Sequence, residues 1–172
     1  MKKRFTHIIC MLMVFIMAFN FTACGSVELE SKTIKGVTLD IPSNFGEFKE
    51  GDGISTATDE DSTCAIVISE KGDAQGIKPT DYEEDTYEQA YMGTYTDTSF
   101  VKFDNKAKID GNPTLFAQFK GTNSKNVKLV VYSYIIFFDD GNCQSISFSY
   151  ADKGDTSLEE NIDSITKSIK IA

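Results

Sequence analysis

The 172-residue sequence is poor in the side chains that most often carry out chemistry near neutral pH. It has no tryptophan, and its one histidine, His7, and its one arginine, Arg4, both lie within the first 23 residues. Residues 24–172 therefore contain no imidazole and no guanidinium group. For that part of the chain, this absence excludes Ser-His-Asp and Cys-His nucleophiles, histidine-ligated metals and bidentate arginine contacts to phosphate.

Positive charge is also scarce. Three of the 17 basic residues stand at positions 2–4, which leaves 14 lysines against 26 acidic residues and a net charge of −12 for residues 24–172. Proteins that bind nucleic acids depend on clustered lysine and arginine to neutralise phosphates. The composition therefore predicts no nucleic-acid partner, and no motif in the chain indicates a cofactor.

The amino terminus has the layout of a bacterial export signal, with basic residues at positions 2–4 followed by an apolar run from Ile8 to Phe19. As a helix, this run would span only ~18 Å of a hydrocarbon core of about 30 Å, so it is too short for a stable transmembrane helix. The segment Phe21-Thr-Ala-Cys-Gly-Ser26 resembles the lipobox of bacterial lipoproteins, in which the cysteine receives a diacylglycerol and becomes the first residue of the mature protein.

This resemblance implies a signal peptide at residues 1–23 and lipidation of Cys24, with a further acyl chain such as palmitate often added to the new amino group. Residues 24–32 are then predicted to be the lipidated cysteine and a short tether, and residues 33–172 a single domain. Two or more acyl chains hold a protein to a bilayer far more firmly than one. We therefore expect the domain on the extracytoplasmic face of the cell membrane. The alternative is an ordinary secretory signal with an incidental cysteine.

The first half of the domain shows strands and one helix. Alternating apolar residues predict a strand from Ile34 to Pro42, and further strands are expected near 53–57 and 63–69. The segment Thr80-Asp-Tyr-Glu83 matches a capping box, in which the first and last side chains satisfy free amides at a helix start. We expect this helix to carry Tyr87, Ala90 and Tyr91, with Tyr95 extending the same stripe and Gly93 near its end.

The second half reads as a four-stranded meander followed by a helix. The strands are predicted at 100–109, 114–120, 127–138 and 143–150, because Asp-Gly turns separate them and supply the positive φ angles of tight connections. Residues 127–138 are apolar on both faces, which favours a central position in the sheet. The closing helix is expected to pack on the sheet through a stripe at helical spacing, made of Leu158, Ile162, Ile165 and Ile169.

This order of elements resembles the Mog1/PsbP-like group. The resemblance rests on the opening strand Gly36–Pro42, the Ile109–Pro113 turn before a long hairpin, and the end of the closing helix at 165–171. It implies an α+β fold in which helices flank a curved antiparallel sheet, an α/β/α arrangement. Known members include photosystem accessory proteins, a Ran-binding protein and many uncharacterised bacterial lipoproteins. The resemblance therefore implies a scaffold, and it assigns no functional residue.

Two groups of side chains are candidates for chemistry. Cys64 and Cys143 form an even pair in an exported chain, and so are a candidate disulfide, with two unbridged thiols as the alternative. The acidic stretches 59–61 and 139–140 have oxygen ligands of the type that Ca²⁺ binds, but neither has the spacing of a known calcium loop. We therefore interpret both stretches as solvated turns and predict no metal.

Four tyrosines fall in or beside the first predicted helix. We expect Tyr87 and Tyr91 to pack on the sheet, and Tyr82 and Tyr95 to be exposed as part of an interaction surface, since tyrosine is common at binding interfaces.

The function that the sequence favours is a non-enzymatic binding or accessory module for a protein or small ligand, displayed on the membrane. The alternative is a small hydrolase without histidine that uses a carboxylate pair or a Ser-Lys dyad. A pocket with two or more convergent ionisable groups would favour the hydrolase.

Overall fold

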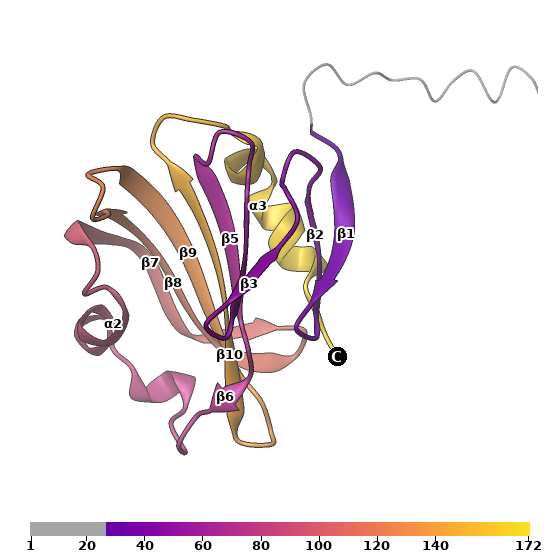
Figure 1. Cartoon of the computed structure of the whole chain (residues 1–172). Coiled ribbons are helices and arrows are strands. Elements are labelled where there is room, and N and C mark those ends of the chain that lie inside the picture. The colour runs from indigo at the N-terminus through magenta and orange to yellow at the C-terminus, as the bar shows by residue number, and fades with distance from the viewer. Residues whose placement is uncertain (1–26) are drawn as a thin grey trace, which may run out of the picture.

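The computed structural model describes residues 27–172 (Figure 1). The predicted signal peptide at residues 1–23 and the lipidation site Cys24 lie outside the described residues. Within residues 27–172, no helix is long and apolar enough to cross a membrane. The strands are β1 (Leu29–Ile34), β2 (Val37–Pro42), β3 (Lys49–Gly51), β4 (Ile54–Thr58), β5 (Cys64–Ser69), β6 (Gly72–Asp73), β7 (Thr96–Ile109), β8 (Asn112–Thr122), β9 (Lys128–Phe137), β10 (Asn142–Ala151) and β11 (Lys170–Ile171). The helices are the 3₁₀-helix η2 (Pro79–Asp81), α2 (Glu84–Tyr91) and α3 (Ser157–Ser168).

The main sheet is antiparallel and has the order β3-β4-β5-β10-β9-β8-β7, with the short β6 also paired to β10. The predicted meander is confirmed, because β7, β8, β9 and β10 are neighbours in the sheet in sequence order. The central position predicted for residues 127–138 is also confirmed, since β9 lies between β8 and β10. The strands predicted near 53–57 and 63–69 correspond to β4 and β5.

The start of the domain holds two strands where the sequence predicted one. Lys35 and Gly36 have φ angles of 50° and 79°, and this turn folds β1 back on β2 in an antiparallel hairpin. The pairing begins with Leu29 opposite Pro42, so residues 29–32, predicted as tether, are part of a strand. With β11, the hairpin forms a separate three-stranded sheet.

The first face of the main sheet is covered by α3 and the three-stranded sheet, which lie on the side opposite α2 (Figure 1). The predicted stripe of the closing helix is confirmed, because Leu158, Ile162, Ile165 and Ile169 are all at most 7% exposed. They pack with side chains from the strands beneath, among them Ile66, Ile68, Ile136, Ile146 and Phe148.

The second face is covered by a shorter element, the two-turn helix α2, together with the rings of Phe100 and Phe103 from β7. Tyr87 of α2 and Met92, just after the helix, are buried and pack in one cluster with Leu115, Phe119, Val131 and Ile135 of the sheet. The α/β/α description therefore fits loosely, because strands dominate the chain and one helical layer is small.

The start of α2 differs from the prediction. Pro79 to Asp81 form a 3₁₀ turn, and Tyr82 then has an extended backbone, with φ −101° and ψ 135°, which interrupts the helix. The helix begins at Glu84, where the Glu83 amide donates to the Thr86 hydroxyl at 2.9 Å. The predicted capping box at 80–83 is therefore wrong, and Tyr95 lies beyond the helix end.

Candidate functional site

The tyrosines around α2 are placed differently from the prediction. Tyr87 is 1% exposed, as expected, and burial raises its pKa to about 12. Tyr91, expected to pack on the sheet, is 41% exposed. Its ring rests on Tyr87, with centroids 5.0 Å apart, and its hydroxyl lies 2.9 Å from that of Tyr82. Tyr91 is the last residue of α2, and besides these rings it borders, with Ser145 and Ser147 of β10, a small cavity at the second face of the sheet.

Tyr82 and Tyr95, predicted to be the exposed pair, are both half-buried. Tyr95 packs edge-on against Phe119, with ring centroids 5.3 Å apart, and its Cβ is the near neighbour of Gly121. The expected two-tyrosine surface is therefore reduced to one exposed ring, that of Tyr91.

The candidate disulfide is not formed, since Cys64 and Cys143 are both free. Cys64 lies opposite Tyr150 in the β5–β10 pairing, whereas Cys143, seven residues earlier on β10, lies opposite Gly72. At ~3.3 Å per strand residue the two sites are about 23 Å apart, and a disulfide needs Cα atoms within about 7 Å. The two thiols also belong to different apolar clusters, one on each face of the sheet.

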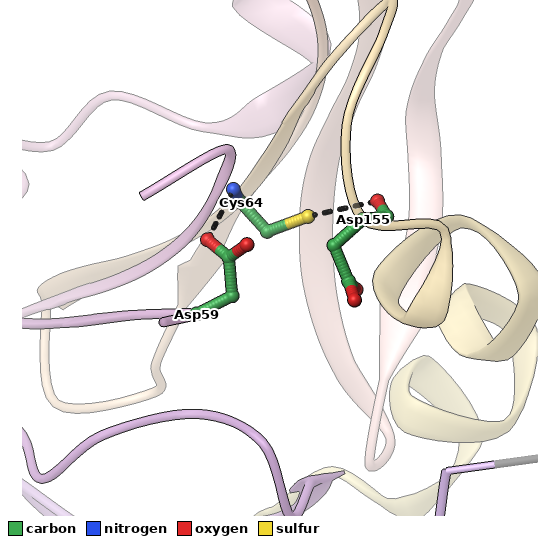
Figure 2. Close-up of side chains that lie close together, drawn as sticks. All are labelled: Asp59, Cys64 and Asp155. Carbon is green, nitrogen blue, oxygen red and sulfur yellow. Dashed lines mark hydrogen bonds between the residues drawn. The ribbon is translucent and has the colours of Figure 1, made fainter. Parts of the chain in front are cut away.

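The thiol of Cys64 instead meets two carboxylates. The side-chain atoms of Asp59, Cys64 and Asp155 that could ligate a metal all lie within 4.8 Å of one another. Figure 2 shows the three residues converging from the turn before β5 and from the segment that leads into α3. Asp59 is only 3% exposed, so the prediction that the whole acidic stretch 59–61 is solvated is wrong for this residue.

Hydrogen bonds already occupy the carboxylates of this cluster. Asp59 accepts from the Cys64 amide at 2.6 Å and from the Thr63 hydroxyl at 2.8 Å. Asp155 accepts from the Ser157 amide at 2.8 Å, which caps the start of α3, and from the Ser157 hydroxyl and the Asn44 side chain. The Cys64 thiol donates to the Asp155 backbone carbonyl at 3.3 Å (Figure 2).

The electrostatics of the cluster disfavour nucleophilic chemistry. Burial, and then the charge of Asp59, raise the pKa of Cys64 to about 11, so the thiol stays protonated near neutral pH, and the thiolate is the nucleophilic form. Burial alone would raise the pKa of Asp155, but hydrogen bonds from Ser157 and Asn44 lower it on balance. We interpret this cluster, Asp59–Cys64–Asp155, as a structural tie between the turn before β5 and the first turn of α3.

A pocket of about 480 Å³ lies near the other end of β10, and we call it the hairpin pocket. Three segments enclose it, namely the loop 74–80, the β7–β8 hairpin at 105–113 and the β9–β10 turn at 137–142. Its volume lies within the range of about 300–1,000 Å³ that is typical of small-molecule sites. Most of its lining surface is apolar, and seven of the sixteen lining residues have apolar side chains, namely Ala74, Ile77, Pro79, Ala107, Pro113, Phe137 and Phe138.

The walls of the hairpin pocket are held in place by hydrogen bonds. The Ala74 amide donates to the Gly141 carbonyl at 3.0 Å, which joins the loop to the β9–β10 turn. The Asn105 side chain donates to the Tyr82 carbonyl at 2.8 Å, which joins the hairpin to the segment before α2. At the hairpin tip, Asp110 accepts from Ile171 and Lys170, and these bonds lower its pKa.

Charged side chains at the hairpin pocket are mostly lysines. Lys78, Lys106 and Lys108 line it, against one carboxylate, Asp139. Within residues 27–172, none of the three lysines has a carboxylate oxygen within 4.0 Å of its amine. Among the residues that line the pocket, lysines therefore outnumber carboxylates by three to one, in a domain that is acidic as a whole.

Sequence reasoning missed this pocket because its residues come from three segments that are distant in the chain. The one available signal was the spacing of Lys102, Lys106 and Lys108, which gathers three of the 14 lysines of residues 24–172 within seven positions. Asp139 was named, but only as part of a solvated turn.

No protein-family model matches the sequence, and no curated protein matches it. Solved structures do share its fold. The chain is similar to the Ran-binding protein Mog1p of Saccharomyces cerevisiae, with a TM-score of 0.57 and 10% identity over 85% of this chain and 96% of that chain. It is also similar to cyanobacterial PsbP (CyanoP) of Synechocystis sp. PCC 6803, with a TM-score of 0.51 and 13% identity over 87% of this chain and 96% of that one. The domain therefore has the Mog1/PsbP-like fold that the sequence resemblance implied.

Proposed function

We propose that this protein is a membrane-anchored extracytoplasmic lipoprotein whose domain is a non-enzymatic binding module, with the hairpin pocket as its binding site. The observation that carries the proposal is the pocket itself, which is concave, mostly apolar and edged by a few charged groups. Those features are typical of small-ligand sites.

The lining of the pocket favours binding over hydrolysis. A carboxylate pair or a Ser-Lys dyad would need two acids, or a serine beside a lysine. Asp139 is the one acid among the lining residues, and Thr80 is the one hydroxyl. Neither arrangement of the alternative hydrolase is assembled there, and the Asp59–Cys64–Asp155 cluster is engaged in structural hydrogen bonds.

The fold neighbours support the same proposal at the level of scaffold. Mog1p is described as a Ran-binding protein, so this fold can serve recognition. Fold alone does not determine function, and at 10% identity no binding residue carries over.

Support for the anchor comes from the lipobox-like sequence around Cys24. Because β1 begins at Leu29, only residues 25–28 separate Cys24 from the first strand. Four extended residues reach at most about 14 Å, so a lipidated protein would hold its domain against the membrane surface.

The proposal is tested on the full chain produced in a bacterial host that lipidates exported proteins. Intact mass should show cleavage before Cys24 and added acyl chains. A chain that retains residues 1–23, or one released to the medium, contradicts the anchor.

Native mass spectrometry of the same preparation tests the binding site, with Ile77→Asp as the pocket variant and Val127→Asp as its control. Both side chains are similarly exposed, at 42% and 38%, but Val127 lies outside the pocket. We expect a bound small molecule that the control retains and the pocket variant loses. Identical spectra for all three proteins would contradict the pocket as the binding site, and hydrolytic turnover would contradict the non-enzymatic role.

A further inference from the structure

We propose that the hairpin pocket binds a single-chain organic carboxylate, with the apolar body inside the pocket and the anionic head among Lys78, Lys106 and Lys108. This inference rests on the proposed function and names its ligand class.

The apolar part of the argument begins with Ile77. It is 42% exposed, and it is one of five large apolar side chains that are clearly exposed within residues 27–172. The four others, Ile54, Tyr91, Val101 and Val127, lie outside the hairpin pocket. Ile77 faces a cavity whose other walls include Pro79, Phe137 and Phe138. A ligand with a hydrocarbon body would remove this apolar surface from water, which is favourable at roughly 0.8 kcal/mol for each buried CH₂.

The charged part of the argument rests on β7. Lys106 and Lys108 are exposed and alternate with Ala107 and Ile109, which pack into the cluster on the first face of the sheet. Both lysines line the hairpin pocket, together with Asn105 and Ala107 of the same segment. The pairing of β7 with β8 is irregular between Asp104 and Ala107, so regular alternation is broken at Lys106, and consecutive residues of this segment border the pocket.

Three acids close in sequence to the pocket residues accept hydrogen bonds from backbone amides. Asp104 accepts from the Lys106 amide at 2.9 Å, Asp81 from the Lys78 amide at 2.8 Å and Asp140 from the Asn142 amide at 3.0 Å. These carboxylates hold turns, and within residues 27–172 no carboxylate oxygen lies within 4.0 Å of the three lysine amines, which are therefore available for an external anion.

The shape and composition of the site favour a carboxylate over a phosphate ester. Lysine amines bind both kinds of anion, but Asp139 also lines the pocket and would repel the second negative charge of a phosphate ester more than the single charge of a carboxylate. The pocket of about 480 Å³ is bounded by walls that hydrogen bonds already hold in place. Little of the binding free energy should therefore be lost in ordering the protein when a single-chain ligand enters.

The experiment uses residues 25–172, which contain both apolar clusters, after a cooperative thermal melt has shown that this chain folds. Hexanoate, octanoate and decanoate are titrated by calorimetry, with decanol as the uncharged probe and acetate as the headgroup alone. We expect affinity to rise by up to about fourfold per added CH₂. Decanol should bind more weakly than decanoate, and acetate should not bind measurably.

Variants assign the two ends of the ligand. Lys106→Gln and Lys108→Gln should each weaken decanoate binding by about two- to fivefold, and less at high salt, while the exposed Lys153→Gln, remote from the pocket, should leave it unchanged. Ile77→Asp should abolish binding, and Val127→Asp should not. Co-sedimentation with phosphatidylglycerol vesicles tests whether the anion that the lysines bind is a free carboxylate or the headgroups of a bilayer.

Each outcome bears on the inference. A chain-length dependence that disappears in Ile77→Asp, together with the lysine effects, supports it. Equal affinity for decanol and decanoate overturns the carboxylate assignment but leaves the pocket as a binding site. Vesicle binding that persists in Ile77→Asp overturns the inference in favour of a membrane surface. Absence of binding by all probes overturns it too, while a pocket-dependent adduct in native mass spectrometry would still uphold the proposed function.

Discussion

The two faces of the main sheet differ in how completely they are covered. On β10, the side chains on the first face are Ile146, Phe148 and Tyr150, and all three are buried beneath α3 and the three-stranded sheet. On the second face, the same strand presents Ser145, Ser147 and Ser149, which are only half-buried because α2 covers the β7–β9 half of the sheet. The hairpin pocket lies beyond the reach of that short helix. The face under α3 and the region of the hairpin pocket therefore differ mainly in how much of the sheet other elements cover, and less in whether reactive side chains are present.

The Asp59–Cys64–Asp155 cluster illustrates the same difference. It has the residue types of a metal site, yet its carboxylates serve amides and hydroxyls of neighbouring turns. In the hairpin pocket, by contrast, three lysine amines have no carboxylate oxygen within 4.0 Å among the described residues. Charged side chains without a protein partner at a concave surface are therefore a better guide to a binding site here than a group of metal-ligating atoms that lie close together.

The largest effect is expected at the covered face. Ile165 is 0% exposed beneath α3, so Ile165→Ala should lower the free energy of unfolding by about 2–5 kcal/mol, measured by urea denaturation. Lys167→Ala, on the exposed side of the same helix, should change it by less than about 0.5 kcal/mol. Equal losses in the two variants would show that α3 does not pack through its apolar stripe.

A smaller effect is expected at the Asp59–Cys64–Asp155 cluster. Asp59→Ala leaves the buried Cys64 amide without its acceptor and should cost about 1–3 kcal/mol in unfolding free energy, whereas Asp61→Ala, exposed in the same turn, should cost less than about 0.5 kcal/mol. Added Zn²⁺ or Ca²⁺ should leave the wild-type melting temperature unchanged. An increase that Asp59→Ala abolishes would show that the cluster binds the ion, because a ligand specific to the folded state stabilises it.

Much of the fold follows from local patterns in the sequence. Asp110-Gly111 is a turn with φ angles of 48° and 83°, and the stripe from Leu158 to Ile169 is buried, as spacing alone predicted. The Lys35-Gly36 turn was missed because lysine is an uncommon residue at positive φ, so the predicted strand ran from Ile34 through the turn, and most of β1 was read as tether. Tertiary contacts, and not local propensity, stabilise that hairpin.

The candidate site was much less predictable. Its walls come from residues 74–80, 105–113 and 137–142, and no periodic pattern connects these segments. Cys64 and Cys143 were paired from their number alone, but the strand register, which separates them by seven residues of β10, is a property of the whole sheet. Sites formed by segments that are distant in the chain therefore cannot be predicted from local sequence patterns.

A third, weaker effect on stability is expected at the second face of the sheet, which α2 covers only in part. Tyr91→Ala removes a 41% exposed ring and its hydroxyl contact with Tyr82, so the unfolding free energy should fall by less than about 1 kcal/mol. Decanoate binding should be unchanged, since Tyr91 does not line the hairpin pocket. Tyr91→Phe, which keeps the ring, is the matched control. If Tyr91→Ala abolishes binding while Tyr91→Phe retains it, the site lies on the tyrosine surface instead.

The smallest effect concerns Asp110, whose carboxylate joins the tip of the β7–β8 hairpin to the end of the chain. Bonds from the Ile171 amide and then from Lys170 lower its pKa in the folded state below the usual value of 3.8. A carboxyl group with a lowered folded-state pKa stabilises the fold above its unfolded pKa and loses that contribution as pH falls through the folded one. Asp110→Asn should therefore lower the melting temperature slightly at pH 7, and the difference from wild type should shrink below about pH 4. Glu47→Gln, which removes one carboxylate at an exposed position, is the control for the loss of a charge. A wild-type minus Asp110→Asn difference that stays constant from pH 7 to pH 3 would show that this carboxylate does not hold the hairpin wall of the pocket.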